Sequence, residues 1–115
     1  MTASVIDPAT FAELQESAGA DFVAELVGTF LEETPALLDE LRSARDAADA
    51  DRFRRAAHSI KSNSQTFGAL ALGLLARNIE LRGLHADAAH DMQAIEALQA
   101  SYAQAAVALK GMPHG

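Results

Sequence analysis

Apolar residues recur at alternating intervals of three and four along most of the chain, the spacing that places side chains on one face of an α-helix. No β-strand pattern competes with this period. The clearest stripe lies between residues 50 and 67 and consists of Phe53, Ala57, Ile60, Ser64 and Phe67. The pattern therefore predicts an all-α protein.

Turn and capping residues divide the pattern into five segments. Asp7-Pro8 supplies an N-cap and a first-turn proline, while Asp21 and Asp49 are expected to cap the next two helices. Gly68 offers the left-handed residue that ends a helix. The predicted helices span residues 8–18, 21–48, 50–67, 69–84 and 87–110, with a frayed tail at residues 111–115.

Two further stripes show how these helices pack. The second helix presents Val23, Val27, Phe30, Thr34, Leu37, Leu41 and Ala44, and the last presents Met92, Ile95, Gln99, Tyr102, Ala106 and Leu109. Pro35 lies inside the second helix and leaves the carbonyl of Leu31 without its usual donor. Helices two to five are expected to form an antiparallel up-and-down four-helix bundle, with the short first helix covering one end. We expect residues 1–115 to form one domain.

Composition excludes several classes of protein. A chain of 115 residues has no room for a nucleotide-binding domain beside this bundle, and without cysteine it has no disulfide or thiolate nucleophile. The longest apolar run, residues 67–76, is far shorter than the roughly 20 residues of a membrane span, which predicts a cytoplasmic protein. A net charge of −7 and only 5% aromatic residues argue against nucleic-acid binding.

The charge is unevenly distributed along the chain. Residues 1–51 carry twelve acids and two bases, whereas residues 52–115 carry four acids and seven bases. Six of those bases lie between Arg52 and Arg82, against the single acid Glu80. For any one arginine, a solvated helix face explains the charge as well as a binding role does.

One histidine stands apart from the apolar stripe of its own helix. At 100° per residue, His58 lies about 140° from the centre of the stripe, Gln65 about 120° and Lys61 about 80°. Arg54 and Arg55 flank the same polar face one turn earlier. The imidazole is therefore expected to face water among cationic side chains.

The chemistry of such a histidine favours reversible group transfer. A neutral imidazole, with a pKa near ~6.5, can attack a phosphoryl group and leave again as a neutral nitrogen, while Lys61 supplies positive charge to the phosphate. No acidic residue lies within one turn of His58 on its helix, so no metal site is expected. His85, His90 and His114 are expected to be ordinary surface residues.

The same residues resemble the histidine-containing phosphotransfer (HPt) domain, whose pattern is His-x-x-Lys-Gly with Gly-Ala ten residues after the histidine. His58, Lys61, Gly68 and Ala69 match it, while Ser62 stands where glycine is usual. The resemblance covers most of residues 8–109. Further matches are Phe30, Leu31, Pro35, Leu37 and Leu38 upstream and Leu72, Leu75, Ala76, Ile79 and Glu80 downstream.

The resemblance implies a stand-alone phosphorelay intermediate. His58 would accept a phosphoryl group from a receiver-domain aspartate or a kinase and pass it to another receiver aspartate. Such a protein is a stoichiometric phosphohistidine carrier rather than an enzyme. Its expected partners are response-regulator receiver domains and a hybrid sensor histidine kinase. We expect a monomer without a cofactor of its own, because the receiver supplies Mg²⁺.

Two groups of residues are expected to assist His58. The supporting group comprises Ser62, Gln65, Gly68, Arg54 and Arg55. Phe22, Leu26 and Thr29 form a second stripe on the second helix and, with Ser59, are expected to dock the receiver near the reactive nitrogen.

Three alternatives to a phosphorelay intermediate remain open. The chain could be a non-catalytic module of the same fold that binds receivers, or a purely structural helical bundle. It could also be the phosphoacceptor helix of a histidine kinase, in which an acidic residue normally follows the histidine. Here Ser59 follows it.

Overall fold

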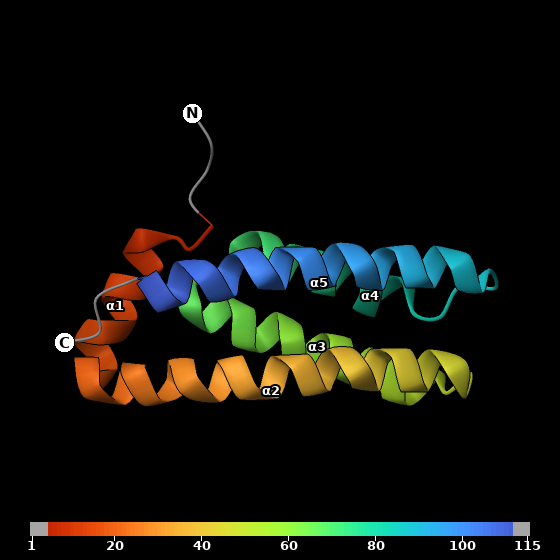
Figure 1. Cartoon of the computed structure of the whole chain (residues 1–115), viewed down its shortest axis with the longest axis horizontal. Helices are drawn as coiled ribbons and strands as arrows, with labels where there is room; N and C mark the ends of the chain where they lie inside the picture. Colours follow the sequence, from red (N-terminus) through yellow and green to blue (C-terminus); the bar gives the residue numbers. More distant parts are fainter. Residues whose placement is uncertain (1–4, 112–115) are drawn as a thin grey trace.

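The computed structural model describes residues 5–111, which fold into five helices without any strand. The helices are α1 (Pro8–Ala18), α2 (Ala20–Asp46), α3 (Ala50–Phe67), α4 (Leu70–Arg82) and α5 (Ala88–Gly111). Helices α2 to α5 form an antiparallel bundle in which each packs against the next and α5 returns to α2, while α1 lies across one end (Figure 1). The predicted all-α bundle with an additional short helix is confirmed.

Most helix ends follow from the capping residues. The carboxylates of Asp7 and Asp49 each accept the backbone N–H three residues further on, both at 3.1 Å, and Gly68 ends α3 with φ +80°. The prediction for Asp21 was wrong. Helix α2 begins one residue earlier, directly after Gly19, so Asp21 lies in its first turn and Gly19 offers no capping side chain.

In α2, α4 and α5 the boundaries differ from the predictions by one or two residues. Helix α2 stops at Asp46 and α4 at Arg82, where Gly83 with φ +71° terminates it. Helix α5 continues through Gly111, and the remainder of the predicted frayed tail lies outside the described residues.

The buried face of α3 is the predicted stripe, but two neighbouring helices differ from prediction. Leu38 is buried in place of Leu37, and Leu98 in place of Gln99. The buried face of each of these helices is displaced by about one residue from the predicted stripe, towards the faces where α2 packs against α3 and α5, and α5 against α2 and α4. Leu37 is half-buried, and the side chain of Gln99 instead hydrogen-bonds Arg42 on α2.

The proline inside α2 creates a contact between two helices. Because Pro35 has no N–H, the carbonyl of Leu31 lacks its helical donor, and the hydroxyl of Tyr102 on α5 donates to this carbonyl at 3.1 Å. The ring of Tyr102 also packs against that of Phe30, with their centroids 5.8 Å apart. Burial raises the pKa of the Tyr102 phenol, which keeps the hydroxyl protonated as a donor.

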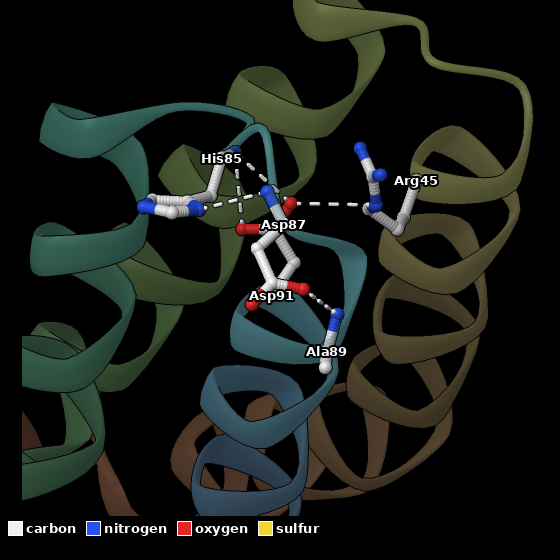
Figure 2. Close-up of polar contacts among 5 residues, drawn as sticks. All are labelled: Arg45, His85, Asp87, Ala89 and Asp91. Atoms are coloured by element: carbon white, nitrogen blue, oxygen red, sulfur yellow. Dashed lines mark hydrogen bonds and ion pairs between the residues drawn. The ribbon is translucent and has the colours of Figure 1, made fainter.

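A buried carboxylate anchors the turn between α4 and α5 (Figure 2). Asp91 is only 2% exposed, and its two oxygens accept the backbone N–H of His85 at 3.0 and 3.2 Å. Arg45 of α2 forms an ion pair with the same carboxylate at 3.4 Å, so the buried charge is compensated. In the same turn, Asp87 donates its N–H to Nδ1 of His85 and accepts the N–H of Ala89. The end of α4 is thereby fixed relative to α2 and α5.

The turn between α3 and α4 is equally constrained. The carbonyl of Gly68 accepts the N–H of Asp7 at 2.8 Å, which attaches the start of α1 to this turn. A Cβ at residue 68 would lie only 3.0 Å from the Asp7 carbonyl oxygen and from Cβ of Thr10. Both the left-handed backbone and the close approach therefore require glycine.

Gly68→Ala is expected to lower the free energy of unfolding by at least about 1–2 kcal/mol, the usual cost of a left-handed backbone for a residue with a Cβ. Gly28→Ala is the matched control, because Gly28 lies exposed within α2 and a Cβ there would meet nothing within 4 Å. The control should gain roughly 0.5–1 kcal/mol. Urea denaturation measures both, and equal stability of the two variants would contradict this account of the turn.

Candidate functional site

His58 lies in the middle of α3 with 56% of its side chain exposed. Its Nδ1 atom is 2.8 Å from Oε2 of Glu80, which projects from α4. The other oxygen of the same carboxylate, Oε1, is 2.8 Å from Nζ of Lys61. One carboxylate from α4 therefore bridges the two α3 residues that the sequence singles out.

The charges in this cluster determine which nitrogen of His58 is free. The hydrogen bond from Lys61 holds the pKa of Glu80 below its ordinary value of 4.5, and the contact with His58 acts in the same direction against the opposing effect of burial. Glu80 is thus an anion at neutral pH and can only accept hydrogen bonds. The proton in this contact must belong to Nδ1 of His58, which leaves the lone pair of a neutral imidazole on Nε2.

A hollow of about 520 Å³ surrounds the exposed imidazole. It is lined by Asp51, Arg54, Arg55, His58, Ser59, Glu80 and Leu81. Arg55 forms an exposed ion pair with Asp51 at 3.4 Å. The hollow thus offers two guanidinium groups beside a nucleophilic nitrogen, which suits an incoming oxyanion.

The other three supporting residues, Ser62, Gln65 and Gly68, do not line this hollow. Ser62 and Gln65 are both exposed on α3, and Gln65 lies two turns beyond His58, with Cγ 3.4 Å from where a Cβ on Gly73 of α4 would be. Gly68 packs against the start of α1, and the α3–α4 turn explains why this residue is a glycine. The structure groups Arg54 and Arg55 with His58 and does not bring Gly68 to the hollow.

The predicted docking residues lie along the α2–α3 face. Phe22 is 52% exposed, while Leu26 and Thr29 line a small groove of about 170 Å³ beside Asn63 and Thr66. Ser59 lines the hollow at His58 and also a second groove of about 300 Å³ that contains Leu37 and Glu40. Phe22, Leu26 and Thr29 line neither the hollow at His58 nor this second groove.

Glu80 is a part of the site that the helical pattern does not predict. It stands out in the sequence only as the single acid among the bases around His58, because a helical wheel of α3 cannot show a side chain that arrives from α4. His85 and His90 were expected to be ordinary surface residues, yet they are half-buried and stack with ring centroids 4.3 Å apart. Arg82 contacts the second of these rings. Across residues 5–111, no three histidine or acidic side chains cluster closely enough to hold a metal ion.

Comparison with known proteins identifies the family of this chain. The sequence model of the Hpt domain matches residues 25–108, which include His58, Lys61 and Glu80. The chain belongs to the Hpt domain family. None of the curated proteins compared with it is a match.

A solved structure resembles this Hpt domain over nearly its whole length. The crystal structure of histidine-containing phosphotransfer protein B (HptB) from Pseudomonas aeruginosa PAO1 matches with a TM-score of 0.80 and 27% sequence identity. The match covers 95% of this chain and 94% of the other. Among the described residues, no helix is long and apolar enough to cross a lipid bilayer.

Lys61→Met should raise the pKa of Glu80, because it removes the largest cause of the depression and leaves the cost of burial in place. Because the pKa of Glu80 is lower in the folded protein than in the unfolded chain, ionised Glu80 stabilises the fold above about pH 4.5. This contribution is lost as the pH falls through the pKa that Glu80 has in the folded protein. Carboxyl ¹³C NMR titration measures the pKa directly. Lys110→Met, at the far end of α5, is the control, and an unchanged Glu80 pKa in Lys61→Met would refute the bridge.

Proposed function

We propose that this chain is a phosphorelay intermediate in which His58 carries the phosphoryl group. It receives the group from the aspartate of a receiver domain, or from a kinase, and passes it to the aspartate of another receiver. The observation that carries the proposal is the exposed imidazole whose Nδ1 is held by Glu80. Membership of the Hpt domain family and the likeness to HptB support a histidine phosphotransfer role.

The chemical step can be written for this geometry. The lone pair on Nε2 attacks the phosphorus of an aspartyl phosphate, so that an N–P bond forms while the P–O bond breaks. The aspartate carboxylate leaves with the electron pair. The imidazole ring becomes positively charged, and its proton stays on Nδ1, where the Glu80 carboxylate accepts it. No proton has to move, and the reverse step returns a neutral imidazole as the leaving group.

The cations around the hollow stabilise the charge of the phosphoryl group during transfer. Negative charge accumulates on the three equatorial oxygens of the phosphoryl group during transfer, and Arg54 and Arg55 line the space that this group would enter. Lys61 offsets the charge of Glu80, which keeps the carboxylate from repelling the phosphate. We assign the required Mg²⁺ and the phospho-accepting aspartate to the partner. The chain is then a carrier whose turnover depends on that partner.

The partners in this proposal are response-regulator receiver domains and a hybrid sensor histidine kinase, which meet the chain as a monomer. A receiver would dock on the α2–α3 face over Phe22, Leu26, Thr29 and Ser59. The exposed ring of Phe22 and the two grooves along this face support that placement. Ser62 is exposed on α3 one turn beyond His58, so a small side chain there permits close approach.

His58→Gln should abolish labelling by a phosphorylated receiver in the presence of Mg²⁺, whereas His90→Gln should retain it. Glutamine removes the nucleophilic nitrogen and keeps a polar side chain on an exposed helix face. The measurement is acid-labile phosphate on the purified protein after incubation with the receiver. Label retained in His58→Gln would show that another residue carries the phosphoryl group.

Glu80→Gln should slow transfer about tenfold without unfolding the protein. A neutral amide can still accept the Nδ1 proton, but a hydrogen bond to a charged group is worth roughly 1–1.5 kcal/mol more than a neutral one, and 1.4 kcal/mol corresponds to a factor of ten. Single-turnover transfer kinetics give the rate. Glu96→Gln, an exposed glutamate on α5, is the control. An equal rate in both variants would remove Glu80 from the mechanism.

A further inference from the structure

Helix α4 carries three exposed leucines that neither neighbouring helix covers. Leu70, Leu74 and Leu81 are 54%, 55% and 69% exposed. At 100° per residue these positions fall within about 40° of one another, so they form a single stripe. We call these three residues the α4 leucine face. The buried residues of α4, by contrast, are those that pack in the bundle, including Leu72, Ala76 and Ile79.

The α4 leucine face is continuous with the site around His58. Leu81 lines the hollow that contains the imidazole, and the preceding residue is Glu80, which holds Nδ1. From Leu81 the face runs back to Leu70, about 16 Å along the helix axis. Exposed apolar clusters beside a reactive group are typical of interaction sites.

The two flanks of His58 carry opposite charge. Between residues 20 and 41, α2 has six acids and no base, and four of these acids remain when Asp39 and Glu40, which pair with Arg42 and Arg52, are left aside. Helix α4 has two bases, Arg77 and Arg82, and its single acid, Glu80, is paired with Lys61. Arg77 is exposed and borders the leucine face, about 20° from Leu70 on the side away from Leu74. A partner with carboxylates at its edge is therefore favoured on the α4 side.

We propose that the α4 leucine face is a second docking surface for a receiver domain, on the opposite flank of His58 from Phe22 and Leu26. It would serve one of the receivers with which His58 exchanges phosphate, while another uses the α2 side. The inference rests on the proposed function. A receiver fits because its acidic phosphoacceptor pocket has to approach His58, and Arg54 and Arg77 lie on this flank.

A second copy of the chain fits this surface less well. Two copies related by a two-fold axis would bring Arg77 towards its own counterpart. The face has no unpaired carboxylate to offset that repulsion, because Glu80 is engaged by Lys61 and His58. The charge of the surface thus selects a heterologous, acidic partner.

The test uses Leu74→Glu and Arg77→Glu on the α4 face, Phe22→Glu on the α2 face, and Val107→Glu as a matched control. Val107 is an apolar side chain on α5 that is 73% exposed. Each purified receiver domain of the source organism is titrated calorimetrically against every variant, and transfer rates are measured with the same pairs. Circular dichroism melting shows which variants remain folded.

The expected result is that both α4 variants weaken binding and transfer at least tenfold with one receiver that Phe22→Glu leaves unaffected. The Val107 variant should behave as wild type. Unchanged binding of every receiver to Leu74→Glu and Arg77→Glu overturns the proposal. So does a wild-type dimer in sedimentation that Leu74→Glu converts to a monomer, since the occupant is then a second copy.

Two observations separate this inference from the proposed function. Arg77→Glu changes an exposed side chain, so it remains informative if Leu74→Glu fails to fold. If no receiver labels wild-type protein, the phosphorelay assignment fails. The calorimetric titrations of the α4 variants still show whether a receiver binds the α4 leucine face. If label is transferred normally through His58 in both α4 variants, only the second docking surface is lost.

Discussion

A carboxylate can hold the Nδ1 proton of an exposed imidazole only if the two backbones are fixed relative to each other, and here the packing of α3 against α4 fixes them. The turn at Gly68 accepts the N–H of Asp7, and at the other end of α4 the buried Asp91 holds the N–H of His85 while pairing with Arg45. With both ends of α4 attached, Glu80 has little freedom to leave His58. The exposed reactive group thus depends on interactions that are buried and distant from it.

The helices and the reactive histidine could be predicted because they depend on local information. The stripe of α3 is strongly periodic, its ends carry Asp49 and Gly68, and His58 falls opposite the stripe wherever the helix packs. Glu80 could not be assigned in the same way, because its role depends on the register between two helices. A signal does exist in the sequence. His58 lies eleven residues before Ala69 and Glu80 eleven residues after it, so an antiparallel hairpin about this turn brings them level.

The errors in the packing prediction have a common physical origin. A helical stripe locates the centre of a buried face only to within about one residue, so Leu38 and Leu98 are buried where Leu37 and Gln99 were expected. The docking residues illustrate a related limit. Phe22 is exposed as a contact residue should be, yet the antiparallel arrangement places Leu26 beside Thr66, towards the end of α3 and away from Ser59. Periodicity shows which face a residue occupies but not which neighbour it meets.

The contact between Tyr102 and the carbonyl that Pro35 leaves free also has a spectroscopic consequence. Tyr102 is the only tyrosine of a chain that has no tryptophan, and its hydroxyl joins α5 to α2 at Leu31. Its near-ultraviolet absorption and fluorescence therefore report on one helix–helix contact. The protein thus contains a natural optical probe of bundle opening that needs no label and that belongs to helices other than the one bearing His58.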